Sequence, residues 1–218
     1  MKRLLIVSLV ILICLPSAFA RKKRAKSGEI KNNVYTDATY NFKLTILENW
    51  EAELQKPKKQ CRLVLQQKDH KIPGELMAYP GLAKVPTLEI HIIEESLNPG
   101  ALVDSIASNS YKSKNKKEIL KNILQLEENL YFDGLTRENK KSLEIDGKKA
   151  ARWDGGSHFT KKISMDETIP RTYGVGMVAI NNGELTIVCL LDCEKTFYNE
   201  LIKEVVTIAE SLKWPELK

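Results

Sequence analysis

The sequence is poor in the residues and motifs that carry chemistry. Its 218 residues include only 3 histidines and 4 cysteines, and aromatic residues make up 7%. It contains no His-Glu-x-x-His motif, no Gly-x-Ser-x-Gly nucleophile elbow and no glycine-rich phosphate loop. The run Asp154-Gly155-Gly156-Ser157 is expected to be a turn, because no helical pattern follows it. The sequence therefore predicts no catalytic residues and no cofactor, and it favours a protein that is not an enzyme.

An excess of charge is also missing from the part of the chain that we expect to fold. The formal charge of +6 depends on Lys2, Arg3 and the five basic residues of segment 21–26. Once these are set aside, 27 of the 34 basic residues remain against 28 acidic ones. A face that binds nucleic acid needs positive charge clustered on the fold itself, so the sequence predicts no nucleic-acid partner.

The N-terminus has the pattern of an export signal. Lys2 and Arg3 precede the apolar run Leu4–Leu15, and Ala18-Phe19-Ala20 is a small-x-small cleavage site. A membrane-spanning helix needs about 20 apolar residues, and this run is shorter. We therefore expect residues 1–20 to be a signal peptide and the protein to be periplasmic or extracellular. The alternative is a membrane anchor formed by an uncleaved segment 1–20, because the basic residues that follow favour keeping that side in the cytoplasm.

Residues 21–33 are predicted to form a basic, polar tail. A solvated linker is the simpler interpretation. The other is a weak contact with anionic lipid headgroups, worth about 1 kcal/mol for each basic residue near the surface, through Arg21, Lys22, Lys23 and Arg24. Residues 34–214 then form a single domain, and residues 215–218 a C-terminal tail.

Within this domain, apolar patterns alternate with turn and helix signals. Asp146-Gly147 and Asn181-Asn182-Gly183 predict hairpin turns, and Asn98-Pro99 predicts the start of a helix. Helices are expected over 98–111, 116–128 and 195–212. Strands are expected over 40–47, 61–66, 86–94, 136–145, 148–153, 173–180 and 185–191. This order predicts an α+β fold, with a mostly antiparallel sheet flanked by helices in an α/β/α sandwich.

Three short motifs of the chain resemble those of a known family. They are Tyr40-Asn41-Phe42 leading to Glu48-Asn49-Trp50, the hairpin Ile145-Asp146-Gly147-Lys148-Lys149-Ala150, and the final Ser211-Leu212-Lys213-Trp214. Together with the element order they resemble the PsbP-like or Mog1-like fold family of secreted and periplasmic domains. The resemblance implies a non-catalytic role in protein interaction or envelope assembly, with an unknown protein partner in the envelope.

Two long loops support an alternative function. Segments 67–84 and 155–166 are predicted to be irregular, and long loops in compact domains are often functional. If they converged, His70 and His158 could line a pocket. The alternative is therefore a small-ligand-binding or hydrolytic protein that uses these two loops.

The cysteines and the remaining histidine give two further expectations. An oxidising compartment favours a disulfide between Cys61 and Cys193, which leaves Cys189 as a buried apolar residue; the alternative is three unpaired thiols. Glu89 and His91 share the outward face of one strand, a geometry that could hold a metal ion. Two ligands do not make a zinc site, so we expect a solvated strand face and no metal site there.

Overall fold

The computed structural model describes residues 25–107, 131–132, 140–162 and 168–215, without the side chains of residues 106–107, 131–132 and 157–162. The predicted signal peptide, the basic residues at 21–24 and the predicted helix 116–128 lie outside this range. None of the helices in the described ranges combines the length and the apolar character that crossing a lipid bilayer requires.

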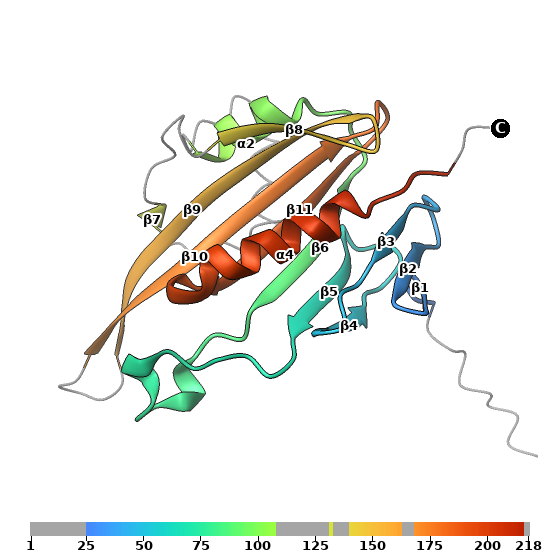
Figure 1. The fold of residues 1–218 in the computed structure, drawn as a ribbon. Coiled ribbons are helices and arrows are strands. Elements are labelled where there is room, and N and C mark those ends of the chain that lie inside the picture. Colours follow the sequence, from blue (N-terminus) through green and yellow to red (C-terminus); the bar gives the residue numbers. More distant parts are fainter. Residues whose placement is uncertain (1–24, 108–130, 133–139, 163–167, 216–218) are drawn as a thin grey trace, which may run out of the picture.

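The described part of the chain contains one large and one small antiparallel sheet (Figure 1). The large sheet has eight strands in the order β4-β5-β6-β11-β10-β9-β7, and β8 also pairs with β9. Its strands are β4 (Trp50–Leu54), β5 (Cys61–Gln67), β6 (Thr87–Ile93), β7 (Tyr131–Phe132), β8 (Lys140–Ile145), β9 (Lys148–Lys162), β10 (Thr168–Asn181) and β11 (Thr186–Glu194). The small sheet consists of β1 (Gly28–Lys31), β2 (Val34–Asp37) and β3 (Lys43–Thr45).

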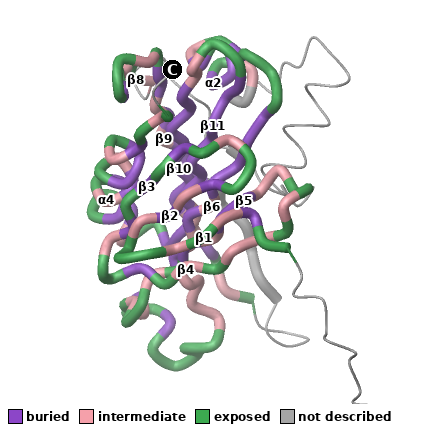
Figure 2. Tube along the Cα trace, turned by 90° about the vertical axis from the view of Figure 1, so that its right-hand side faces the viewer, coloured by how far each residue is buried: buried purple, intermediate pink, exposed green. Residues whose placement is uncertain are grey.

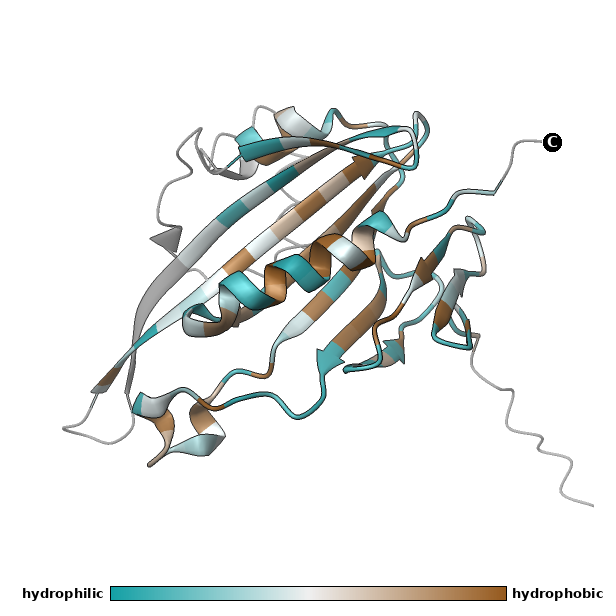
Figure 3. Cartoon of the chain, viewed as in Figure 1, coloured by the Kyte–Doolittle hydropathy of each residue, from teal (hydrophilic) through white to brown (hydrophobic). Residues whose placement is uncertain are grey.

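Two helices pack on opposite faces of the large sheet. Helix α4 (Tyr198–Glu210) follows the 3₁₀ turn η4 (Lys195–Phe197). Its apolar residues, spaced by three and four, form a stripe that is buried against one face of the large sheet, which we call the α4 face. Figure 3 shows this alternation of hydrophobic and hydrophilic residues along the helix. Helix α2 (Pro99–Ala107) packs on the opposite face of the large sheet, which we call the α2 face, around Trp153 and Met177. The predicted α+β sandwich is confirmed.

Strand β11 lies in the middle of the large sheet, as its apolar character on both faces predicts. It pairs with β10 on one side and β6 on the other, and all its residues but Asp192 are buried. In Figure 2 the strands at the centre of the sheet are accordingly the most continuously buried part of the chain. The residues of β11 divide between the faces: Cys189 and Leu191 belong to the α4-face core, and Val188 and Leu190 to the α2-face core.

Local turn chemistry accounts for the observed hairpins. Asp146 and Gly147 both have positive φ angles, 50° and 71°, as the tight turn between β8 and β9 needs. Gly183, with φ of 100°, closes the turn between β10 and β11. The Asn98 side chain accepts a hydrogen bond from the backbone N–H of Ala101 at 3.0 Å and so begins α2 as predicted.

The irregular loop predicted over 155–166 is wrong for most of its length. Strand β9 continues to Lys162 and pairs with β10 from Thr168 onward. Gly155 is required inside this strand, because a Cβ atom there would lie 2.3 Å from the indole of Trp153. The glycine pattern that suggests a loop instead makes room for a large side chain on the α2 face.

The folded part also begins earlier than Val34. Ser27 is fully buried, and β1 lies in the segment predicted to be tail. Arg62 of β5 joins this small sheet to the large one by a buried ion pair with Asp37, with the Arg62 Nε and Asp37 Oδ2 atoms 2.8 Å apart. The indole Nε1–H of Trp50 donates a hydrogen bond to Glu204 of α4 at 2.7 Å.

Candidate functional site

An irregularity in β5 brings three potential metal ligands together. Leu63 of β5 pairs with Ile90 of β6, but Cys61 pairs with His91, so one extra residue is inserted between the two pairs. Directly opposed residues of neighbouring strands project to the same face of a sheet. The bulge therefore turns Cys61 away from the α4 face, which Leu63 occupies, and onto the face of Glu89 and His91.

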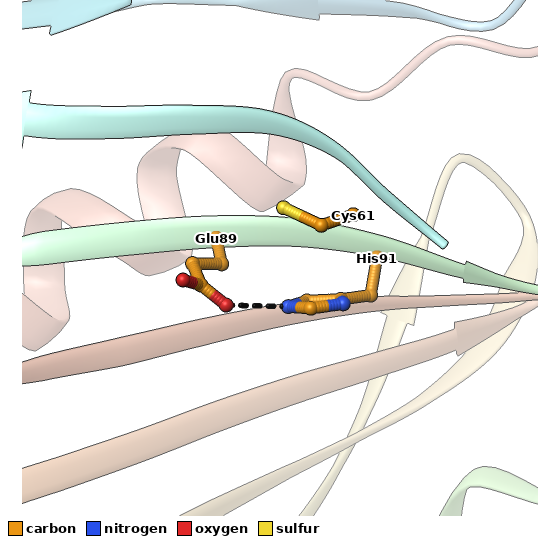
Figure 4. A group of neighbouring side chains, drawn as sticks. All are labelled: Cys61, Glu89 and His91. Carbon is orange, nitrogen blue, oxygen red and sulfur yellow. Dashed lines mark hydrogen bonds and ion pairs between the residues drawn. The ribbon is translucent and has the colours of Figure 1, made fainter. Parts of the chain in front are cut away.

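The three side chains form a compact cluster (Figure 4). The Cys61 sulfur, a Glu89 carboxylate oxygen and an imidazole nitrogen of His91 all lie within 4.8 Å of one another. The Nε2 atom of His91 is 2.7 Å from the Glu89 carboxylate. The side chain of His91 is only 2% exposed and that of Glu89 is 23% exposed. The expectation of a solvated strand face is therefore wrong for His91.

Hydrogen bonding in this cluster is incomplete. The Nδ1 atom of His91 is buried and has no hydrogen-bond partner among the residues that the structure describes. The thiol of Cys61 has only a long contact to the carbonyl oxygen of Leu63, at 3.7 Å. Buried polar atoms without partners are uncommon in proteins, and each needs a physical explanation.

The electrostatics of Cys61 oppose its use as a free nucleophile. Burial, followed by the negative charge of Glu89, raises the pKa of the Cys61 thiol to about 12, against a smaller opposite effect of Lys59. A nucleophilic cysteine requires a lowered pKa, usually from a neighbouring cation. Here the imidazole is paired with Glu89 and not with the thiol. Sulfur, nitrogen and carboxylate oxygen are, however, the three ligand types that zinc sites in proteins use.

The predicted disulfide between Cys61 and Cys193 does not form. Cys61, Cys189 and Cys193 are free thiols, the alternative that the sequence left open. Cys193 belongs to the core of the α4 face, whereas the bulge places Cys61 on the opposite face. Two cysteines that project to opposite faces of a sheet cannot meet the geometry of a disulfide bond.

The loop between β5 and β6, residues 68–86, is the second notable feature. It is irregular as predicted, but it contains two 3₁₀ turns, η1 (Gly74–Leu76) and η2 (Pro80–Leu82). Within the loop, the side chain of Leu76 is fully buried, whereas Met77 is 69% exposed and Tyr79 is 37% exposed. These two are the exposed large hydrophobic residues of the described chain.

A buried ionic cluster fixes the end of this loop to the large sheet. Arg171 of β10 forms a buried ion pair with Glu194 of β11 and donates to the carbonyl oxygen of Leu82 at 3.2 Å. The backbone N–H of Lys84 donates to Glu194 at 2.6 Å, and its ammonium group pairs with Asp192. Charged groups of β10 and β11 therefore anchor the C-terminal end of the loop, at Leu82 and Lys84, to the large sheet.

The predicted pocket of His70 and His158 remains a prediction. His70 is half-buried just after β5. The backbone of His158 lies in β9, opposite Thr172 and Tyr131, but its side chain is outside the described part of the structure. A cavity of about 290 Å³ occurs elsewhere, between Tyr40, Arg62 and Glu94, and residues of both charges line it.

The sequence does not indicate the cluster of potential metal ligands, because alternation along the predicted strand 61–66 places Cys61 on the same face as Leu63 and Leu65. That placement follows from strict alternation, which a bulge breaks by one residue. The shared strand face of Glu89 and His91, where we expected no metal site, is where the structure places two of the three side chains of the cluster. No local feature of the sequence around Cys61 marks the extra residue.

No protein-family model matches the sequence, and no curated protein matches it. The structure is similar to the solution structure of a cyanobacterial PsbP from Synechocystis sp. PCC 6803, with 10% identity and a TM-score of 0.49 over 88% of this chain and 98% of that one. It is also similar to LpqN of Mycobacterium tuberculosis, which is involved in cell envelope biogenesis, with 12% identity and a TM-score of 0.44 over 80% and 84% of the two chains. A PsbP protein is thus among the structures that this chain resembles, as the sequence motifs predicted.

Proposed function

We propose that this chain is an exported, non-catalytic domain that binds a protein partner in the cell envelope through its 68–86 loop. The observation that carries the proposal is the exposure of Met77 and Tyr79 on a loop whose C-terminal end is anchored to the large sheet by buried charges. Export rests on the signal-like pattern of residues 1–20.

An ordered loop loses less conformational entropy than a free one when it binds a partner. Fixing a loop in one conformation costs roughly 1–2 kcal/mol of backbone entropy per residue, and a loop that is already fixed does not lose this freedom again on binding. Methionine and tyrosine are enriched at protein interfaces, where they supply large contact area. An anchored loop that presents both residues is therefore suited to recognise a partner.

Site-specific photo-cross-linking in intact cells tests this proposal. A photoreactive amino acid at Met77 is expected to give one predominant cross-linked species in the envelope fraction. The matched control places the same amino acid at Glu184, which is exposed on the turn between β10 and β11. Equal cross-linking at both positions, or none at Met77, would contradict the proposal.

With the cross-linked partner identified, the affinity of loop variants gives a quantitative test. Met77→Glu is expected to weaken binding about tenfold or more, because the loss of a hot-spot residue costs about 2 kcal/mol or more and about 1.4 kcal/mol is tenfold in affinity. Glu184→Lys serves as the charge-changing control and should leave the affinity unchanged. An unchanged affinity of Met77→Glu would remove the loop from the interface.

Export has a separate test. N-terminal sequencing of the protein from cells is expected to begin after Ala20. A chain that begins at Met1 in the membrane fraction would favour the uncleaved anchor instead. Neither outcome depends on the result of the cross-linking experiment.

A further inference from the structure

We propose that Cys61, Glu89 and His91 form a binding site for a divalent transition metal ion, and that Zn²⁺ is the ion that fits these donors best. This inference is independent of the proposed function. It rests on the donor types, their spacing, their burial and the backbone that holds them.

The donor set selects the class of metal. Sulfur and imidazole nitrogen are soft or borderline ligands that favour zinc and its neighbours over magnesium and calcium, which take oxygen ligands. Zinc bonds to sulfur at about 2.3 Å and to nitrogen or oxygen at about 2.0–2.2 Å. The donor atoms of a tetrahedral site then lie about 3.3–3.8 Å apart by this geometry. Ligand atoms within 4.8 Å of one another reach that spacing by small side-chain rotations.

The charge of the site matches a divalent cation. With the metal bound, Cys61 is a thiolate, Glu89 is a carboxylate and His91 is a neutral imidazole, so the ligands together carry two negative charges. A buried ion is tolerated only when its charge is compensated in this way. Formation of the sulfur–metal bond replaces the S–H bond of Cys61, and the proton passes to solvent.

The backbone around the site is fixed before the metal arrives. Glu89 and His91 are two residues apart on β6, which pairs with β5 on one side and β11 on the other. The bulge supplies the third ligand from the adjacent strand, and bulges are over-represented where a side chain must be re-aimed at a functional site. Ligands on paired strands are positioned more accurately than ligands on loops.

The weak contact of the Cys61 thiol has an explanation in this site. A thiolate that coordinates the metal through sulfur no longer depends on its long contact to the carbonyl oxygen of Leu63, and His91 exchanges its hydrogen bond with Glu89 for a bond to the metal. Three protein ligands leave a fourth position for water, and the partial exposure of Glu89 gives solvent a route to it.

Zinc titration of the chelator-treated, reduced protein tests the site. We expect one Zn²⁺ to bind per chain, measured by competition with a chromophoric chelator. Cys61→Ala is expected to weaken this binding by more than about 100-fold, because even residues beyond the ligands change metal affinity by about 10–100-fold. Cys193→Ala, which removes a buried thiol on the opposite face, is the matched control and should bind as the wild type does.

Cobalt spectroscopy identifies the ligands directly. Co²⁺ bound to the wild type should show the charge-transfer absorption of a thiolate–cobalt bond, which Cys61→Ala loses and Cys193→Ala keeps. Glu89→Gln and His91→Gln preserve side-chain size and should also weaken binding, with circular dichroism used to verify their folds. Absence of stoichiometric zinc binding, or zinc binding that Cys61→Ala leaves intact, would overturn the proposal.

Discussion

Two buried polar clusters begin at adjacent residues of β5 and differ in how completely their atoms are paired. The guanidinium of Arg62 donates to both carboxylate oxygens of Asp37, at 2.8 and 3.2 Å, and to the Thr39 hydroxyl at 2.8 Å. The neighbouring thiol of Cys61 has one long contact, and His91 has a buried nitrogen that no described residue pairs with. The first cluster is complete without a ligand, and the second is not.

The two clusters illustrate two roles that buried polar side chains can have, one in the fold and one in binding. A fully paired network fixes the relative position of two elements, here the small sheet and the large one. An incompletely paired network contributes less to stability, and its donor atoms remain free to bind something else. The comparison predicts a large loss of stability when the first cluster is broken and a small one when a residue of the second is removed.

The largest effect is expected for Arg62→Met. This change leaves the Asp37 carboxylate buried without its cation, and breaking a buried pair from one side costs about 3–5 kcal/mol. Urea unfolding followed by circular dichroism should show a loss of this size in the free energy of unfolding.

The paired substitution is the control for this prediction. Asp37→Leu combined with Arg62→Met removes both charges and should recover part of the loss, since replacing both partners by apolar groups is often close to neutral. A loss below about 1 kcal/mol in Arg62→Met would show that the cluster is not the structural joint that its hydrogen bonds indicate.

Acid should weaken the same joint by a smaller amount. Burial alone would raise the pKa of Asp37, but hydrogen bonds from Arg62 and from the backbone of Tyr40 and Thr39 hold that pKa below its usual value. The stabilisation is therefore present above the ordinary aspartate pKa of about 3.9 and is lost as the pH falls through the lower pKa of the folded state. Urea unfolding at pH 7 and pH 3 should show this loss.

Arg62→Met again supplies the comparison. Without the guanidinium, the pKa of Asp37 is no longer held low, so the variant should lose less stability between the two pH values than the wild type does. An identical loss in both proteins would assign the acid sensitivity to other carboxylates, such as Asp146, whose pKa is also lowered, chiefly by Lys213.

Much of this architecture follows from local rules. Asp146-Gly147 fixes one hairpin, and the alternation of Leu88 and Ile90 identifies the inward face of β6. The three- and four-residue spacing of Leu201, Val205 and Ile208 predicts the buried stripe of α4. Each of these features depends on residues close in sequence, which is why the sequence alone suffices to predict them.

The features that escaped prediction depend on how side chains pack and how strands pair, which the residue types alone do not show. Gly155 lies inside a strand because the indole of Trp153 needs its space, and β1 forms because β2 pairs with it. The position of Cys61 depends on a register shift against β6, which the residues of β5 alone do not encode. The sequence therefore placed Glu89 and His91 on one strand face, where we expected no metal site, and did not indicate that Cys61 joins them.

The smallest effect is expected for His91→Leu in metal-free protein. Because one ring nitrogen is already unpaired and Glu89 remains partly accessible to water, removing the imidazole should change the free energy of unfolding by less than about 1 kcal/mol. Excess Zn²⁺ should then separate the two proteins, since a ligand at 100 times its dissociation constant stabilises the folded state by about 2.7 kcal/mol. Only the wild type can gain this stabilisation at the site. A loss in metal-free His91→Leu as large as that in Arg62→Met would mean that both clusters serve the fold alone, and the distinction drawn from their hydrogen bonds would not hold.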